Sequence, residues 1–300
     1  MINNFLEFSK DVKDAILNKK PVIALESTII SHGMPYPQNL QVAETLEKIA
    51  YDLGVTPATI AIINGKLKVG LSKEELYILA NSKNVEKVSL RDISRVLIDK
   101  KIGATTVAAT MFIANLAKIK VFATGGIGGV HRNYDKILDI SADMTAFASI
   151  PVIVVTAGAK AILDLKNTIE YLETFGVPVL GYKTNDFPAF YSSESGIKIE
   201  RIDETNRIAE IYNTNIALGL KTGMIIANPI SKEYEIKFDE MKTIISKALI
   251  EAKKNNVTGK NITPFLLSKI VELTNGKSLQ TNIELVKNNV KLACEIAKNL

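Results

Sequence analysis

The sequence lacks two features that define large classes of protein, namely paired cysteines and long hydrophobic runs. Cys294 is the only cysteine, so no disulfide can form within the chain, which agrees with a reducing compartment. No apolar run approaches the ~20 residues that span a bilayer, and the first residues lack the apolar core of a signal peptide. We therefore expect a soluble, cytoplasmic protein without a membrane partner.

Several ligand-binding signatures are absent as well. The net charge of +5 is spread along the chain, with no Lys/Arg block and no basic stretch interleaved with aromatic residues, so nucleic-acid binding is not expected. No cluster of Cys and His has the spacing of a zinc site, and the absence of a Walker A sequence disfavours a nucleotide-dependent sugar kinase. The mild positive balance does suit a small anionic substrate such as a phosphate ester.

The composition is that of a globular protein, and the hydrophobic pattern predicts strands that alternate with helices. Hydrophobic residues make up 47% and charged residues 23%, which supports a sizeable core. Short apolar runs predict buried parallel strands at 21–30, 119–124, 151–156 and 177–182. Amphipathic segments predict helices at 40–53 and 160–176.

Local signals and the chain's overall organisation complete this prediction. Asn64-Gly65 predicts a hairpin turn, Ser72 with Glu75 predicts a helix-capping box, and the pattern after residue 229 is mainly helical. No repeat and no linker is visible, so we expect a single domain over residues 1–300. The expected fold is α/β, a three-layer α/β/α sandwich with a largely parallel central sheet and a helical C-terminal part.

Glu26 is a charged residue inside a predicted apolar strand. Burial disfavours the carboxylate form and raises the pKa, which suits a general acid. A structural ion pair with a buried lysine or arginine would explain the same position, and the pattern alone leaves both interpretations open.

A glycine-rich segment, GGIGGVHR at 125–132, directly follows a predicted strand. Glycines let backbone N–H groups approach an anion, although the dinucleotide fingerprint fails because His131 occupies its third glycine position. Four glycines exceed what one tight turn requires, so we interpret the segment as a ligand loop. Both histidines, His32 and His131, lie beside glycine-containing loops, where the sites of open α/β sheets gather.

Asp139 and Asp143, in the segment DISAD, would share one face of a helix. From a loop, either carboxylate could bind a hard divalent cation. A helix cap or a solvated turn is the alternative.

Lys160 follows the strand at 151–156 and a glycine turn, and we predict that it opens the next helix. The partial positive charge of a helix N-terminus and partial burial both favour the neutral amine. The neutral amine is the form that attacks an electrophilic carbon. An exposed, charged lysine is the alternative.

Taken together, several long segments resemble the pseudouridine-5′-phosphate glycosidase family, also called the indigoidine synthase A-like family. They are ALESTIISHGMPYPQN, GGIGGVHR, DISAD, TAGAKAILDL, YLETFGVPVLGY, FPAFYSS, TPFLL and SLQTNIELVKNNV. The resemblance implies an α/β/α core, a homotrimer and a bound Mn²⁺, with Mg²⁺ as an alternative. It also implies reversible cleavage of pseudouridine 5′-phosphate to uracil and ribose 5-phosphate.

The resemblance assigns roles to individual residues. Glu26 matches the proton donor, Lys160 matches the nucleophile that becomes covalently bound to the sugar, and Asp139 matches the metal-binding aspartate. The substrate-binding positions match Lys87, Val107, Ser141, Ala142 and Asp143.

The residue chemistry suits cleavage of a carbon–carbon glycosidic bond. Carbon has no lone pair to protonate, so the two-carboxylate route of ordinary glycosidases is poor here. Glu26 would protonate the ribose ring oxygen while Lys160 attacks C1′, which leads to a lysine–ribose iminium. Two alternatives stay open. One is an N-nucleosidase that acts on a nucleoside 5′-phosphate through Glu26 and Asp139, and the other is a non-catalytic phosphosugar-binding protein.

Overall fold

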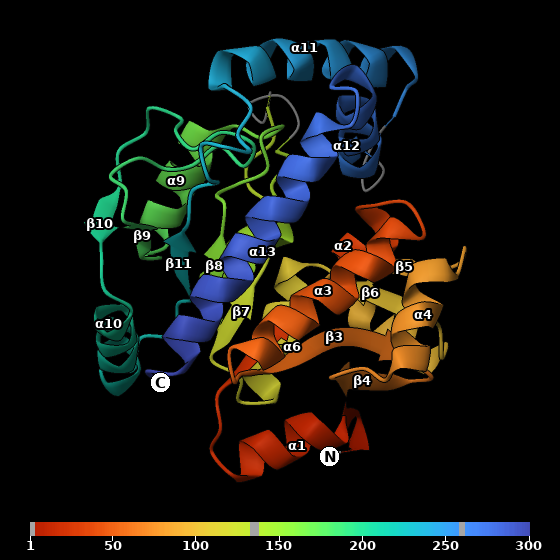
Figure 1. Ribbon diagram of the computed structural model, residues 1–300, viewed down its shortest axis with the longest axis vertical. Coiled ribbons are helices and arrows are strands. Elements are labelled where there is room, and N and C mark those ends of the chain that lie inside the picture. Colours follow the sequence, from red (N-terminus) through yellow and green to blue (C-terminus); the bar gives the residue numbers. More distant parts are fainter. Residues whose placement is uncertain (1–3, 133–137, 258–261) are drawn as a thin grey trace.

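A computed structural model describes residues 4–132, 138–257 and 262–300 of the chain, in which strands and helices alternate (Figure 1). The strands are β1 (Leu6–Phe8), β2 (Val22–Leu25), β3 (Thr56–Ile63), β4 (Lys66–Val69), β5 (Glu86–Val88), β6 (Gly103–Thr105), β7 (Val121–Ala123), β8 (Ile153–Thr156), β9 (Val179–Tyr182), β10 (Glu200–Ile202) and β11 (Met224–Ala227). The helices are α1 (Lys10–Leu17), α2 (Thr28–His32), α3 (Gln38–Asp52), α4 (Lys73–Asn81), the 3₁₀ helix η2 (Leu90–Asp92), α5 (Ile93–Ile98), α6 (Val107–Leu116), α8 (Ala142–Phe147), α9 (Leu165–Thr174), α10 (Thr205–Ala217), α11 (Phe238–Lys254), α12 (Ile262–Leu273) and α13 (Lys277–Ala297).

The strands join into one sheet in the order β1-β4-β3-β2-β7-β8-β11-β9-β10, with β6 on β3 and β5 on β6. From β3 through β2 to β10 every neighbouring pair is parallel, whereas β3 is antiparallel to β4 and to β6. Every residue of β7, β8 and β11 is buried. Strands covered on both faces need apolar side chains throughout, which is why these segments are continuous apolar runs in the sequence.

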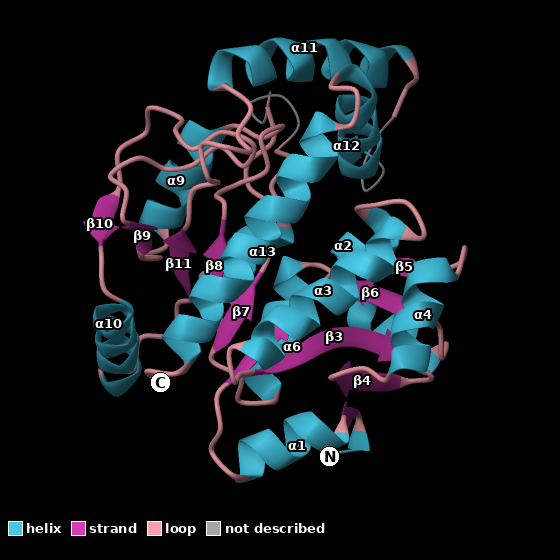
Figure 2. Cartoon of the chain, viewed as in Figure 1, coloured by secondary structure: helices cyan, strands magenta, loops and turns pink. Residues whose placement is uncertain are grey.

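Helices cover the sheet in two layers. α3 and α13 pack against each other and contact β2, β3, β7 and β8, and Figure 2 shows both helices crossing in front of the strands. α6 contacts β2, β3 and β7 and packs against α8 in the other layer. The three-layer prediction is confirmed, as is the helical C-terminal part, in which α11 and α12 pack together at one end of the molecule (Figure 1). None of the helices in the described ranges is both long enough and apolar enough to cross a membrane.

The two local predictions are also confirmed. Asn64 and Gly65 have φ values of 52° and 72°, and they connect β3 to the antiparallel β4, in which Lys66 pairs with Ile63. Two consecutive positive φ values are the requirement of a type I′ hairpin turn. Ser72 and Glu75 form the predicted capping box at the start of α4.

Two predicted boundaries are wrong, namely the end of the strand before Glu26 and the start of the helix after Lys160. The strand predicted at 21–30 ends at Leu25, because hydroxyl groups redirect the chain: Ser27 Oγ donates to the Ile60 carbonyl at 2.7 Å and Thr28 Oγ1 donates to the Thr105 carbonyl at 2.7 Å. The helix predicted from residue 160 begins instead at Leu165, where Asp164 Oδ1 accepts the backbone N–H of Asn167 at 3.1 Å and caps it.

Candidate active site

A pocket of about 560 Å³ lies beyond the carboxyl ends of β2, β7 and β8. Parallel strands bring the segments that follow them to one edge of the sheet, which is where open α/β folds bind ligands. The lining includes every residue given a role in the sequence analysis, namely Glu26, Lys87, Val107, Asp139, Ser141, Ala142, Asp143 and Lys160, and also His32, His131, Gly125, Gly126 and Gly128.

Glu26 directly follows β2 and is 9% exposed. Thr124, the residue after β7, donates its hydroxyl hydrogen to Glu26 Oε1. Burial raises the pKa of Glu26 above its ordinary value, and this effect exceeds the lowering influences of Lys160, Thr124 and Lys87. The carboxyl group therefore keeps its proton at pH values where an exposed glutamate is ionised, which is the state that a proton donor needs.

Lys160 lies between β8 and α9, not at the start of a helix. Its backbone N–H donates to the Ile127 carbonyl at 3.0 Å, and its carbonyl accepts the N–H of Leu163 at 2.9 Å, so both sides of the residue are fixed. Because α9 begins only at Leu165, the prediction that a helix N-terminus acts on this amine is wrong. The Lys160 ammonium opposes the rise in the pKa of Glu26 and adds to the lowering of the pKa of His131, so the Lys160 side chain acts electrostatically on both groups.

The glycine segment is built for close packing. A Cβ on Gly128 would lie 2.2 Å from Ser141 Oγ and 2.6 Å from Asp143 Oδ2, and a Cβ on Gly126 would lie 2.4 Å from the Phe190 ring. The Gly128 N–H donates to Asp143 Oδ2 at 2.7 Å, so the anion that it binds is a carboxylate of the chain itself. The glycines therefore shape the pocket wall.

Asp143 is the second residue of α8 and is 4% exposed. Besides the Gly128 N–H, it accepts the N–H of Ala108, in the first turn of α6, at 2.9 Å. One carboxylate thus joins α8, α6 and the glycine segment. Asp139 lies outside α8, which begins at Ala142, so the two aspartates do not share a helix face.

Replacing Asp143 by asparagine is expected to lower the free energy of unfolding by about 1–3 kcal/mol, because the amide group of asparagine would face one of these two N–H donors and leave it unsatisfied. Urea unfolding of the two proteins measures the difference. Asp203→Asn is the control, since this exposed carboxylate accepts from the neighbouring Arg201 Nε, at 2.8 Å, and its loss should change little. Equal stability of the Asp143→Asn variant and the wild type would contradict the assignment.

His131 and Asp139 form a second polar group in the pocket. His131 Nδ1 lies 3.8 Å from Asp139 Oδ2, and the His131 N–H donates to the Asp139 carbonyl at 2.9 Å. Burial lowers the pKa of His131, and although Asp139 opposes this effect, Lys160 and Lys87 reinforce it. Within the described ranges, no group of three or more His, Cys, Asp or Glu side chains is placed to hold a metal.

The structure adds pocket residues that the sequence did not reveal. Thr106 Oγ1 and Asn282 Oδ1 are buried and have no hydrogen-bond partner within the part of the chain that the structure describes. Both residues line the pocket, as do Phe190 and Arg91. Since buried polar atoms are normally hydrogen-bonded, these two acceptors are available to a ligand. Asn282 and Phe190 lie in segments that carry the family resemblance, whereas Thr106 and Arg91 do not.

Known proteins resemble the chain over nearly its whole length. The family model described as indigoidine synthase A like protein matches residues 11–299. A pseudouridine-5′-phosphate glycosidase of Petrotoga mobilis is 57% identical over 295 residues, which cover 98% of this chain and 96% of that protein. A protein of the same name from Caldanaerobacter subterraneus subsp. tengcongensis is 54% identical over 300 residues, covering 100% and 98%.

Two solved structures share the fold. An indigoidine synthase A-like protein from Thermotoga maritima superimposes with a TM-score of 0.90 at 37% identity, covering 98% of this chain and 95% of that chain. The prealnumycin C-glycosynthase AlnA, solved in complex with ribulose 5-phosphate, superimposes with a TM-score of 0.91 at 34% identity, covering 99% and 97%. Both alignments span the segments that form the pocket.

Proposed function

The chain belongs to the indigoidine synthase A-like family, and from this premise we propose that it is a pseudouridine-5′-phosphate glycosidase. The enzyme reversibly cleaves the C–C bond between ribose and uracil in pseudouridine 5′-phosphate and yields uracil and ribose 5-phosphate, a step of pseudouridine catabolism. The observation that carries the proposal is one pocket that holds Lys160, Lys87 and the buried Glu26, whose pKa is raised by burial. A glycosynthase of similar structure that binds a pentulose phosphate supports the same substrate class.

In the first step, Glu26 gives its proton to the ribose ring oxygen as the bond between that oxygen and C1′ breaks. The Lys160 amine forms a new bond to C1′ and passes its surplus proton to the Glu26 carboxylate, so that an open-chain sugar is attached to the enzyme through nitrogen. Thr124 holds the Glu26 carboxyl group through its hydrogen bond.

In the second step, the Glu26 carboxyl group, which now carries the proton released by Lys160, supplies it to uracil C5. The electron pair of the C1′–C5 bond moves into the uracil ring, and the nitrogen lone pair of Lys160 forms a C1′=N iminium, or protonated Schiff base. Water then adds to C1′, the bond to Lys160 breaks, and ribose 5-phosphate leaves. The overall reaction consumes one water molecule, and the carbon leaving group never has to depart as a free carbanion.

The phosphate group would bind where α6 and α8 begin. Lys87 supplies a positive charge, Val107 and Ala142 supply backbone N–H groups, and Ser141 supplies its hydroxyl group. Asp143 holds the two helix starts together through its bonds to Ala108 and Gly128. The positive ends of two helices and a lysine suit a dianionic phosphate ester.

Asp139 would hold a divalent cation, Mn²⁺ or alternatively Mg²⁺. Its carboxylate is 44% exposed and lines the pocket, so it keeps lone pairs for a ligand, whereas Glu26 and Asp143 use theirs in hydrogen bonds. One protein carboxylate completed by water and substrate oxygens is a donor set that hard cations accept. When bound, the ion would polarise substrate oxygens and orient water.

Chelation of divalent cations is expected to reduce turnover by roughly 100-fold, and Asp139→Asn should have a similar effect, because a metal contributes several kcal/mol of charge stabilisation. Added Mn²⁺ should restore the chelated wild type but not the variant. Binding of Mn²⁺, measured by electron paramagnetic resonance, should weaken in Asp139→Asn and stay unchanged in the surface control Asp203→Asn. Full activity of the chelated enzyme would contradict the metal site.

The activity itself is tested by uracil release from pseudouridine 5′-phosphate with and without Mn²⁺. Release of uracil from pseudouridine 5′-phosphate and not from uridine 5′-phosphate is the expected result. The reverse preference would indicate an N-nucleosidase that uses Glu26 and Asp139. Binding of ribose 5-phosphate without any turnover would indicate a non-catalytic phosphosugar-binding protein.

Assembly and location belong to the same proposal. We expect a homotrimer, which sedimentation equilibrium would test. We also expect a cytoplasmic enzyme, because charged phosphate esters do not cross membranes unaided and a phosphosugar enzyme must share a compartment with its substrate.

A further inference from the structure

Lys87, proposed to bind the phosphate group, is carried by a short and peripheral strand. β5 has three residues and, among the strands that the structure describes, pairs with β6 alone, with Lys87 opposite Ala104. Its last residue, Val88, accepts the N–H of Thr106 at 2.9 Å, just before α6 begins. A strand of this length at the end of a sheet has few backbone bonds of its own, so side-chain contacts of the neighbouring residues contribute to where Lys87 points.

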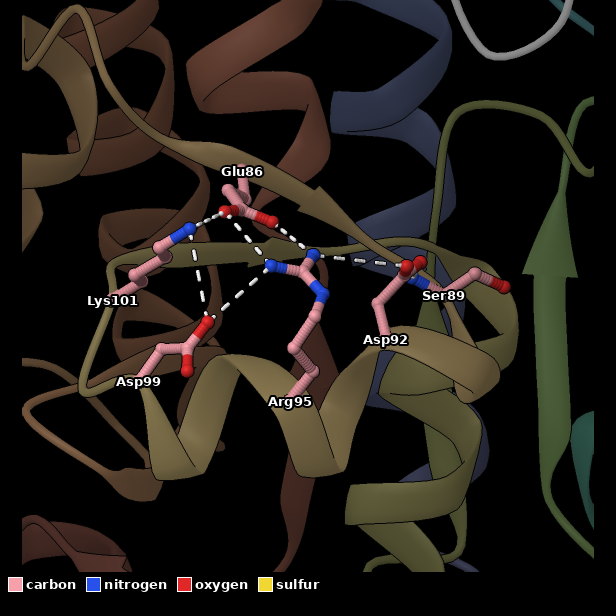
Figure 3. Close-up of polar contacts among 6 residues, drawn as sticks. All are labelled: Glu86, Ser89, Asp92, Arg95, Asp99 and Lys101. Atoms are coloured by element: carbon pink, nitrogen blue, oxygen red, sulfur yellow. Dashed lines mark hydrogen bonds and ion pairs between the residues drawn. The ribbon is translucent and has the colours of Figure 1, made fainter.

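Arg95, on α5, holds the outer side of β5 (Figure 3). It donates from both terminal nitrogens to Glu86, with Nη1 3.1 Å from Oε1 and Nη2 bonded to Oε2. Lys101 Nζ adds a bond to Glu86 Oε1 at 2.8 Å. Successive residues of a strand face opposite sides, so fixing Glu86 on the outer side directs its neighbour Lys87 inward to the pocket that it lines.

The same arginine reaches the segment that follows β5. Arg95 Nη2 lies 4.0 Å from Asp92 Oδ1, and Asp92 Oδ2 accepts the N–H of Ser89 at 3.1 Å (Figure 3). Asp99 closes the network, 3.7 Å from Arg95 and 3.8 Å from Lys101. The network therefore holds the chain by hydrogen bonds and ion pairs on both sides of Lys87. It contacts Glu86 before Lys87, and Ser89 and Asp92 after it.

Exposed ion pairs usually contribute little to stability, and Arg95 is 47% exposed. This network differs from such pairs in its geometry, because a bidentate arginine–carboxylate contact defines both a distance and a plane. Hydrogen bonds from Arg95 and Lys101 lower the pKa of Glu86 to about 2, so the contact stays charged throughout the pH range of an activity assay. Its effect should therefore be on orientation, with little effect on overall stability.

We propose that Arg95 is a positioning residue that orients Lys87 toward the substrate phosphate by clamping both ends of the β5–η2 segment. This inference rests on the proposed function, because it assumes that Lys87 binds the phosphate group. Arg95 itself does not line the pocket, so it acts only through the segment that it holds.

Replacing Arg95 by methionine is expected to raise KM for pseudouridine 5′-phosphate about 10-fold while kcat changes less than about 2-fold, because a misplaced binding group weakens uniform binding. The dissociation constant of ribose 5-phosphate, measured by calorimetry, should rise by the same factor. Arg95→Lys should recover only part of the loss, since lysine cannot make the bidentate contact. Arg201→Met, which removes an exposed arginine paired with Asp203, is the matched control and should change neither constant.

A double-mutant cycle with Lys87→Met separates positioning from a general structural role. If Arg95 acts through Lys87, Arg95→Met should have no further effect on ribose 5-phosphate binding in the Lys87→Met background. An equal loss in both backgrounds, or a fall in kcat at unchanged KM, would overturn the proposal. The calorimetric cycle remains valid if no uracil is released, so failure of the proposed function and failure of this inference can be told apart.

Discussion

Replacing Lys160 by alanine is expected to lower kcat by about four orders of magnitude or more, since removal of a covalent nucleophile leaves only binding and positioning effects. In the proposed reaction no other group provides the nitrogen lone pair that drives the C1′–C5 bond apart. Substrate binding should persist, because Lys87, Val107 and Ser141 remain in place. The expected signature is therefore a collapse of kcat with a ribose 5-phosphate affinity that changes little.

Lys166→Ala is the control for this experiment. Lys166 is an exposed lysine on α9, outside the pocket, so the same truncation there should leave turnover intact. Circular dichroism would verify that both variants are folded. Retention of more than about one tenth of wild-type turnover by Lys160→Ala would be incompatible with a nucleophile at this position.

Replacing Glu26 by glutamine is expected to lower kcat/KM by about 10²–10⁴, the usual contribution of a general acid. The amide fills the same space but has no proton to give to the ribose ring oxygen. In the wild type, kcat/KM should fall as the pH rises through the raised pKa of Glu26, because the carboxyl group then loses the proton that it donates. The remaining activity of the glutamine variant should lack this decline.

The same substitution should stabilise the protein at neutral and alkaline pH. A carboxyl group whose pKa is raised on folding adds stability below its unfolded pKa, and this stability is lost as the pH rises through the folded value. Glutamine does not titrate, so the difference in melting temperature between variant and wild type should grow from pH 5 to pH 8. A difference that is independent of pH would show that burial does not perturb Glu26.

Glu47 offers a matched control for both effects. Burial also raises its pKa, and it accepts a hydrogen bond from Thr59 Oγ1 at 2.6 Å, but it lies outside the candidate active site. Glu47→Gln should therefore reproduce the pH-dependent stabilisation without the loss of activity. A comparable loss of activity in this variant would mean that the effect of Glu26→Gln is structural.

The parts of the fold that the sequence predicts are those with a strong local signal. β7, β8 and β9 are apolar on both faces, and the turn at Asn64-Gly65 needs positive φ values that few residues adopt. β5 and β6 have three residues each and depend on partners distant in sequence, so no local periodicity reveals them. The sequence therefore does not predict β5, the strand that contains Lys87, although the family resemblance identifies Lys87 itself.

The candidate site was predicted as a set of residues but only partly as an arrangement. Apolar patterning predicts too long a strand around Glu26 and too long a helix around Lys160. It does not register the tertiary hydrogen bonds of Ser27 and Thr28 or the short-range cap at Asp164. The buried state of Glu26 was predicted correctly from its apolar neighbours. The two hydrogen bonds of Asp143 could not be predicted from the sequence. They are donated by the backbone N–H groups of Ala108 and Gly128, and every residue except proline has such a group.

The central claim is that Lys160 forms the covalent bond to the sugar, and trapping tests it most directly. The enzyme is incubated with ribose 5-phosphate, reduced with borohydride and digested, and the modified peptide is identified by mass spectrometry. The account predicts one modified residue, Lys160, heavier by the mass of ribose 5-phosphate less one oxygen atom. A label on Lys87 or another lysine, or no label under conditions in which uracil is released, would contradict it.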